Sequence, residues 1–144
     1  MTVALAIDLG TVRVGVAVTD ESGTIAMPLI TLPRGKGKSL HDAIVGLVAQ
    51  RAVSRVIVGL PRRLDGSDGA NAADARSFAA ELEAALSVPV ELWDERFTTA
   101  EAERSLIASG VRRRERRSTV DQVAATLLLQ GWMQADRLRT ARGH

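Results

Sequence analysis

The sequence predicts an α/β domain with one mixed five-stranded sheet and helices on both of its faces. Three short strand-like segments come first, separated by tight turns, which is the pattern of an antiparallel meander. Strand-like and helix-like segments then alternate along the rest of the chain, as they do in parallel β-α-β units. A chain of 144 residues suits one domain with its own core, so we expect a single domain over 1–144 with a disordered tail from about residue 139.

The first three strands are expected over 3–8, 13–19 and 25–32. The segment 3–8 is a short apolar run, whereas 13–19 alternates valine with small residues. Gly10 lies in the first connection, and residues 21–23 (Glu-Ser-Gly) form the second. Strands joined by such short turns pair antiparallel.

The remaining elements follow from helical and strand periodicity. Ser39 is a residue type that caps helices, so we expect a helix from there to about residue 52. Its apolar face consists of Leu40, Ile44, Leu47 and Val48. The elements after it are a buried strand over 55–60, a helix over 72–86, a strand over 88–93, a helix capped by Thr98 or Thr99, and a last helix that starts at a Thr119–Gln122 capping box and ends near residue 138.

The composition excludes several kinds of protein. Hydrophobic residues make up 46% and charged residues 25% of the chain, a balance typical of a folded soluble domain. Cysteine is absent and only two histidines are present, which excludes a disulfide framework and argues against a zinc site. The N-terminal segment has no basic leader, and no apolar run reaches the roughly 20 residues of a membrane span. We therefore expect a cytoplasmic protein that has no membrane partner.

Arginine is concentrated in one segment near the C-terminus. The chain has 17 arginines and 2 lysines, although its formal net charge is only +2. Five arginines surround a single glutamate at 115, which gives this segment a net charge of +4; they are Arg112, Arg113, Arg114, Arg116 and Arg117. Guanidinium groups can bind two phosphate oxygens at once, so we expect a loop that binds a nucleic-acid backbone. The alternative is a solvated loop whose arginines reflect the base composition of the genome.

Four acidic residues are expected near one edge of the sheet. Asp8 ends the first strand, and Asp94 and Glu95 end the fifth, which we expect beside it. Ligands gather outside the carboxyl ends of parallel strands, so these carboxylates can converge. Asp121 falls in the first turn of the last helix, and the small and apolar residues that follow it at helical spacing predict that this face packs on the sheet.

Each carboxylate also has a simpler explanation. Asp8 could form a local turn, and Glu95 could pair with Arg96. Asp121 could be favoured by the helix dipole alone. Converging carboxylates repel one another, however, and hard divalent cations such as Mg²⁺ or Mn²⁺ remove that repulsion through oxygen ligands. Two such ions can activate a water and stabilise the leaving oxygen of a phosphodiester. The pattern favours a metal-dependent nuclease, and the residues alone leave the choice between Asp94 and Glu95 open.

Four ordered motifs resemble those of the YqgF/RuvX family. They are Asp8-Leu-Gly-Thr-Val-Arg13-Val-Gly15, Gly59-Leu60-Pro61 with Asp65-Gly66-Ser67, Asp94-Glu95-Arg96-Phe-Thr98-Thr99, and Asp121 followed by Ala124-Ala125. The resemblance extends from Asp8 to about Met133. It implies an RNase H-like fold, a relation to the Holliday-junction resolvase RuvC, and a role in maturing the 5′ end of the 16S ribosomal RNA precursor.

The resemblance also implies a site. It assigns Asp8, Glu95 and Asp121 as the catalytic carboxylates that bind the metal, with Asp94 as an outer contributor. The matching basic positions, which would hold phosphate or orient the acids, are Arg13 and Arg96.

Two features depart from the family pattern. Arg62 and Arg63 stand where the family usually has less charged residues, so they either contact the nucleic-acid backbone or are merely exposed. Gln122 stands where lysine is frequent, which removes one positive charge beside the proposed metal site.

The substrate allows more than one hypothesis. The first is an endonuclease acting on precursor ribosomal RNA, and the second is a junction-resolving DNA nuclease that would work as a homodimer. Aromatic residues make up only 3% of the chain, so recognition would depend on backbone charge and shape. Trp132 and Met133 could form a dimer contact, although ordinary packing explains them better. Nucleotide binding is a third hypothesis, which we discount because sugar kinases of this fold hold the nucleotide between two such domains. A non-catalytic RNA-binding factor is the remaining alternative.

Overall fold

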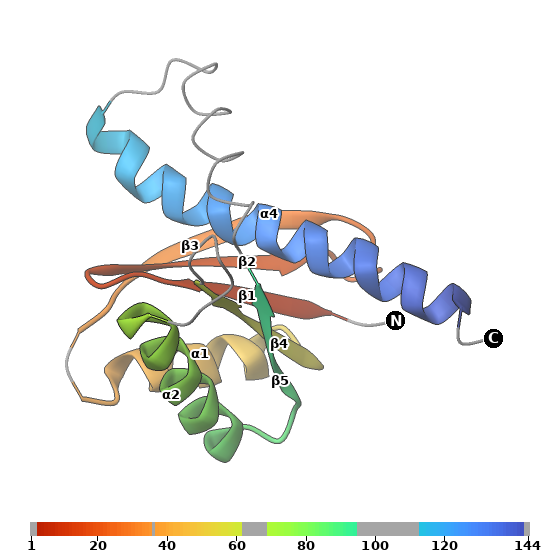
Figure 1. Ribbon diagram of the computed structural model, residues 1–144, viewed down its shortest axis with the longest axis horizontal. Coiled ribbons are helices and arrows are strands. Elements are labelled where there is room, and N and C mark those ends of the chain that lie inside the picture. The colour runs from red at the N-terminus through yellow and green to blue at the C-terminus, as the bar shows by residue number, and fades with distance from the viewer. Residues whose placement is uncertain (1–2, 36, 62–68, 95–112, 143–144) are drawn as a thin grey trace.

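Figure 1 shows the computed structural model, which describes residues 3–35, 37–61, 69–94 and 113–142. Residues 70, 113–121, 141 and 142 are described by their backbone alone. The loop 62–68 and the helix expected after Thr98 or Thr99 lie outside these ranges. The described elements are β1 (Ala4–Leu9), β2 (Arg13–Thr19), β3 (Ala26–Pro33), α1 (Ser39–Gln50), β4 (Arg55–Leu60), α2 (Ala70–Ala85), β5 (Val90–Asp94) and α4 (Arg113–Arg142).

The five strands form one mixed sheet in the order β3-β2-β1-β4-β5. β1 pairs antiparallel with β2, and β2 pairs antiparallel with β3. β1 also pairs parallel with β4, which pairs parallel with β5. The predicted meander and parallel pair are therefore confirmed. The expectation that the first and fifth strands are neighbours is wrong, because β4 lies between them.

The two faces of the sheet are covered by different helices (Figure 1). α1 and α2 lie on one face, and α4 crosses the other, which we call the α4 face. Successive side chains along each strand point to opposite faces of the sheet. In β1, Leu5 and Ile7 belong to the cluster that includes α1 and α2, whereas Ala4 and Ala6 belong to the cluster that includes α4.

Small side chains line the α4 face of the central strands. Ala4, Ala6 and Ala17 are fully or almost fully buried there beneath α4. α4 contributes Ala125, Leu128, Leu129, Trp132 and Met133 to the same cluster. The small strand residues allow the long helix to approach the sheet closely, and its own larger side chains then fill the interface.

Two of the predicted helix starts, at Ser39 and at the Thr119–Gln122 capping box, differ from the structure. The N-cap of α1 is Lys38, with no side-chain cap hydrogen bond, so Ser39 is the first helical residue rather than the cap. α4 begins at Arg113, which places the expected Thr119–Gln122 capping box inside the helix. The expected loop from 113 to 117 is therefore helical, because arginine and glutamate are good helix formers.

The C-terminal residues also differ from expectation. α4 continues through the segment from 139 and ends at Arg142. Arg139 pairs with Glu91 at 3.6 Å and with Asp136 at 3.5 Å, so this last part of the helix contacts both the sheet and the preceding turn. Within the described ranges, none of the helices is both long enough and apolar enough to cross a membrane.

Candidate active site at the carboxyl end of the central strand

Asp8 lies one residue before the end of β1, on the α4 face. It follows Ala4 and Ala6 at two-residue steps, and these alanines pack beneath α4. Its own position is half-buried. The central strand therefore presents a carboxylate at its carboxyl end, on the side covered by the last helix.

A row of paired residues connects Asp8 with α4. Asp8 pairs with Gly15 of β2, and Gly15 pairs with Thr31 of β3. Neighbouring strands are about 4.8 Å apart, so Asp8 and Thr31 lie roughly 10 Å apart across the sheet. Gln122 of α4 donates from Nε2 to the Thr31 hydroxyl oxygen at 2.9 Å. This bond fixes α4 above the row that contains Asp8.

Asp121 occupies the position next to Gln122 in α4. Its backbone therefore lies above the row that contains Asp8, although its side chain is outside what the structure describes. Position 121 is in the interior of the helix, which corrects the expectation of a first-turn residue. The prediction that the following face packs on the sheet is confirmed, because Ala124, Ala125 and Leu128 are buried.

The C-terminal half of α4 is held by a polar contact with β5. Trp132 donates its indole N–H to Glu91 Oε2 at 2.6 Å. The Arg55 guanidinium carbon lies 5.6 Å from the centre of the Trp132 ring, and an Arg55 nitrogen is 3.9 Å from Glu91. These contacts fix the height and rotation of α4 over the sheet.

Asp94 is not on the same face as Asp8. Trp93 packs in the α4 cluster, and an ideal Cβ on Gly131 of α4 would lie 3.5 Å from the Trp93 indole nitrogen. Leu92 packs with the opposite cluster, so alternation places Asp94 on that opposite face, with β4 between it and Asp8. Glu95 lies outside the described residues.

Arg13 is placed beside Asp8 by the pairing of β1 with β2. It starts β2 two residues before Gly15, on the same face, and so is the diagonal neighbour of Asp8 across the antiparallel pair. Diagonal neighbours are about 7–8 Å apart, within the reach of a long side chain. A cation from β2 can therefore serve the same site as the carboxylate from β1.

The turn after Asp8 is built by close backbone contacts. Gly10 donates its N–H to the Arg13 carbonyl at 3.0 Å. A Cβ at Gly10 would lie 2.3 Å from that same carbonyl oxygen. The turn therefore requires glycine at this position because the chain approaches itself too closely for a side chain.

An ion pair that the sequence reasoning missed holds the outer side of this turn. Arg34 donates to the Gly10 carbonyl at 3.0 Å and to both carboxylate oxygens of Asp74 in α2, at 2.8 and 2.9 Å. The hydrogen bonds from Arg34 lower the pKa of Asp74 below its ordinary value, and the same bonds raise the pKa of Arg34. The partners are 40 residues apart, and no local sequence pattern connects them.

Most of the predicted basic side chains lie outside what the structure describes. Arg62, Arg63, Arg96 and Arg112 lie outside the described residues. Arg113, Arg114, Arg116 and Arg117 lie in the first turns of α4, where only the backbone is described.

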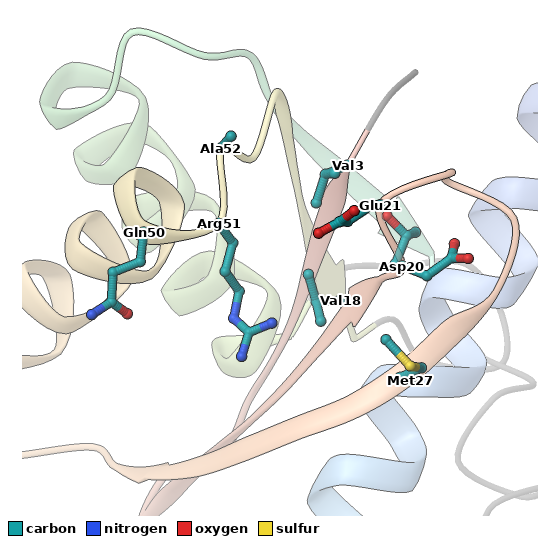
Figure 2. A pocket seen from close by; sticks show the side chains of 9 residues that line it. Val3, Val18, Asp20, Glu21, Met27, Gln50, Arg51 and Ala52 are labelled. Carbon is teal, nitrogen blue, oxygen red and sulfur yellow. The ribbon is translucent and has the colours of Figure 1, made fainter.

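A hollow of about 960 Å³ lies at the other end of β1. Figure 2 shows Val3 and Val18 within it, with Arg51 on one side and Asp20 and Glu21 on the other. Hydrogen bonds from Ser22 and from the Ile25 and Thr24 amides to the Asp20 carboxylate lower its pKa, so this acid stabilises the β2–β3 turn. The hollow is separate from the candidate site at Asp8.

The donor set fits a hard divalent cation only in part within the described residues. The described side chains contain no group of three acidic, histidine or cysteine residues that could hold a metal ion. Two of the three predicted ligands, Glu95 and Asp121, are not described at the side-chain level. The oxygen chemistry of Asp8 and the backbone position of Asp121 agree with such a site.

The sequence model of the RuvX family, described as "Holliday junction resolvase", matches residues 2–135. The chain belongs to the RuvX family. A Myxococcus xanthus relative is 43% identical over 133 residues, covering 92% of this chain and 88% of its own. An Anaeromyxobacter dehalogenans relative is 48% identical over 130 residues, covering 90% and 94%. Both carry the name "Putative pre-16S rRNA nuclease".

Solved structures show the fold of this RuvX-family chain. Thermus thermophilus RuvC in complex with a Holliday junction substrate matches with a TM-score of 0.57 at 16% identity, over 93% of this chain and 97% of that one. The fowlpox virus Holliday junction resolvase matches with a TM-score of 0.54 at 11% identity, over 93% and 99%. The implied RNase H-like fold is therefore confirmed. At such low identity these structures support the fold alone.

Proposed function

We propose that this RuvX-family protein is a divalent-metal-dependent endonuclease that hydrolyses phosphodiester bonds in the 5′ region of the 16S ribosomal RNA precursor. The main observation is the placement of Asp8. It stands at the carboxyl end of the central strand, on the α4 face, in a row over which Gln122 fixes α4. The backbone of Asp121 is next to that contact, which supports a site that draws one carboxylate from β1 and another from α4.

Asp8, Glu95 and Asp121 would hold Mg²⁺ or Mn²⁺ through carboxylate oxygens. When bound, the metal would supply the Lewis acidity to activate water and to stabilise the leaving oxygen of the phosphodiester. Asp94 is at most an outer contributor, because β4 and the plane of the sheet separate it from Asp8. This placement supports the choice of Glu95.

Arg13 would bind the phosphate beside the cleaved bond. It lies diagonal to Asp8 on the same face, so its guanidinium can neutralise phosphate charge while Asp8 serves the metal. The arginines from 112 to 117 would bind the backbone farther along the substrate. Because the chain has no tyrosine and few other aromatics, backbone charge and shape dominate recognition.

The RNA substrate rests on the names of the relatives. Proteins 43% and 48% identical to this chain are named for the 16S precursor, which supports a proposed activity in the bacterial cytoplasm. A four-way DNA junction is the second candidate because the family description names it. Trp132 and Met133, considered above as a dimer contact, are 4% and 6% exposed and pack against the sheet. Because both side chains are buried, neither can form the contact between two copies of the chain.

The deciding experiment compares a 5′-extended 16S precursor with a four-way DNA junction, each with Mg²⁺ and with Mn²⁺. Wild type is tested beside Asp8→Asn and beside Asp42→Asn, a control in the first turn of α1 where the carboxylate is exposed. We expect cleavage of the precursor by wild type and the control, and loss of cleavage with retained binding for Asp8→Asn. Wild-type cleavage by Asp8→Asn would contradict the site. Cleavage of the junction alone would replace the RNA substrate with the second candidate.

A further inference from the structure

Arg34 connects three segments around the turn that follows Asp8. It stands directly after β3, and its backbone N–H donates to the Val12 carbonyl at 2.8 Å. Its guanidinium donates to the Gly10 carbonyl at 3.0 Å and reaches Asp74 of α2. The end of β3, the turn over 10–12 and α2 therefore meet at one side chain.

The hydrogen bonds of the Arg34 guanidinium are divided between its two terminal nitrogens. Nη2 donates to Asp74 Oδ1 at 2.8 Å, and Nη1 donates to Asp74 Oδ2 at 2.9 Å. The second hydrogen of Nη1 is left for the Gly10 carbonyl at 3.0 Å. The paired contact with the carboxylate fixes the plane of the guanidinium, and this plane aims the remaining hydrogen at Gly10. A lysine, whose ammonium is a point charge, cannot reproduce this planar arrangement.

Among the described residues, apolar packing does little to hold this turn. Thr11 is exposed, and Val12 is 67% exposed, so apolar burial contributes little to its conformation. Its inner side is held by the hydrogen bond from Gly10 to the Arg13 carbonyl. Arg34 supplies two further hydrogen bonds from the opposite side. The turn joins the strand end that bears Asp8 to the strand start that bears Arg13.

We propose that Arg34 and Asp74 form a positioning pair that fixes the turn over 10–12 and thereby aligns Asp8 with Arg13. This role rests on the proposed function, because it concerns the orientation of a metal-binding carboxylate. Groups that hydrogen-bond directly to a metal ligand typically change metal affinity about 10–100-fold when replaced, and Arg34 acts two residues along the backbone from Asp8, so we expect the lower end of that range. α2 thus takes part in the site through Asp74, although it lies on the opposite face of the sheet.

The test uses Arg34→Lys and Asp74→Asn, with Asp136→Asn as the matched control. Asp136 pairs with Arg139 near the end of α4, and its side chain is 42% exposed, against 43% for Asp74. Amide hydrogen exchange at Gly10 and Arg34, whose N–H groups donate within the turn, reports the turn directly. We expect both amides to exchange about 10-fold faster in Arg34→Lys and Asp74→Asn and at the wild-type rate in Asp136→Asn. Unchanged exchange in both variants would overturn the proposal.

A second measurement separates positioning from general stability. Mn²⁺ alone is titrated against the protein and followed by paramagnetic broadening of the Asp8 amide signal. We expect the midpoint to rise about 10-fold in both variants and to keep its wild-type value in Asp136→Asn. A uniform rise of exchange across the whole chain, without a shifted Mn²⁺ midpoint, would mean a purely structural pair and would overturn the proposal. If wild type cleaves no nucleic acid, the proposed function fails, yet the exchange and Mn²⁺ measurements still decide the role of Arg34.

Discussion

Replacing Gly10 with alanine adds one methyl group to the turn that follows Asp8. The new Cβ would lie 2.3 Å from the Arg13 carbonyl oxygen, much closer than real Cβ atoms come to other heavy atoms. The obstructing atom belongs to the backbone, and it is also the acceptor of the Gly10 N–H at 3.0 Å. The turn must therefore open, because no flexible side chain can move aside.

The expected cost has two parts. Breaking the hydrogen bond between Gly10 and Arg13 costs about 1 kcal/mol. Forcing a methyl group into a closely packed position costs about 1–3 kcal/mol more. We therefore expect the free energy of unfolding to fall by about 2–4 kcal/mol. The displaced turn begins two residues after Asp8, and a shift of about 1 Å at a catalytic group can cost roughly 100-fold in rate.

The assay combines urea unfolding with single-turnover cleavage under conditions where the variant is folded. Gly46→Ala is the matched control, because Gly46 lies inside α1 and an ideal Cβ there meets nothing within 4 Å. Alanine in a helix interior should raise stability by about 0.5–1 kcal/mol and leave the rate unchanged. A loss below about 0.5 kcal/mol for Gly10→Ala would refute the tight turn. A normal rate in a destabilised variant would refute its link to Asp8.

Three further predictions concern the contacts that hold α2 and α4. Trp132→Phe removes the N–H that binds Glu91 and should lower the free energy of unfolding by about 2 kcal/mol, measured in urea; a change under about 0.5 kcal/mol would contradict the anchor. Gln122→Ala should lower the free energy of unfolding by about 1 kcal/mol. In a double-mutant cycle with Thr31→Val the two losses should not add, and additive losses would show that the hydrogen bond between these side chains contributes nothing. The pKa of Asp74 is lowered on folding, from its ordinary value of 3.8. The ionised carboxylate therefore adds about 1 kcal/mol or less to the free energy of unfolding above pH 3.8, and this stabilisation disappears as the pH falls through the lower folded pKa. The stability difference between wild type and Asp74→Asn should therefore shrink with acid, and a constant difference down to pH ~2 would exclude that cause.

The strands could be predicted because their patterns are local. The segments 13–19 and 55–60 are strands with the expected bounds, since each alternates or concentrates apolar residues between clear turn signals. Local patterns do not predict the start of α4. Its first turns are rich in arginine and show no apolar period, a pattern typical of a loop, although arginine itself favours helices.

The site was only partly predictable because its geometry depends on pairing between distant segments. Asp8 and the buried face of α4 follow from local patterns. The position of β4 between β1 and β5 does not, because sequence order cannot specify the order of parallel strands. Gln122 shows the same limit. Its spacing from Thr119 fits a capping box, yet its side chain instead binds Thr31, 91 residues away.

The hydrogen bond between Trp132 and Glu91 helps to set where the backbone of position 121 lies over the sheet. Positions 121 and 132 are eleven residues apart, which is about three helical turns, so they lie on nearly the same side of α4. Trp132 is buried against the sheet and bonded to Glu91, which fixes the rotation of the helix about its axis. Gln122, ten residues earlier in α4, binds Thr31 of β3. Position 121 is next to the Gln122 contact and about three turns from the Trp132 contact, so both contacts bear on where its backbone lies, and we expect Gln122→Ala and Trp132→Phe each to lower the single-turnover cleavage rate.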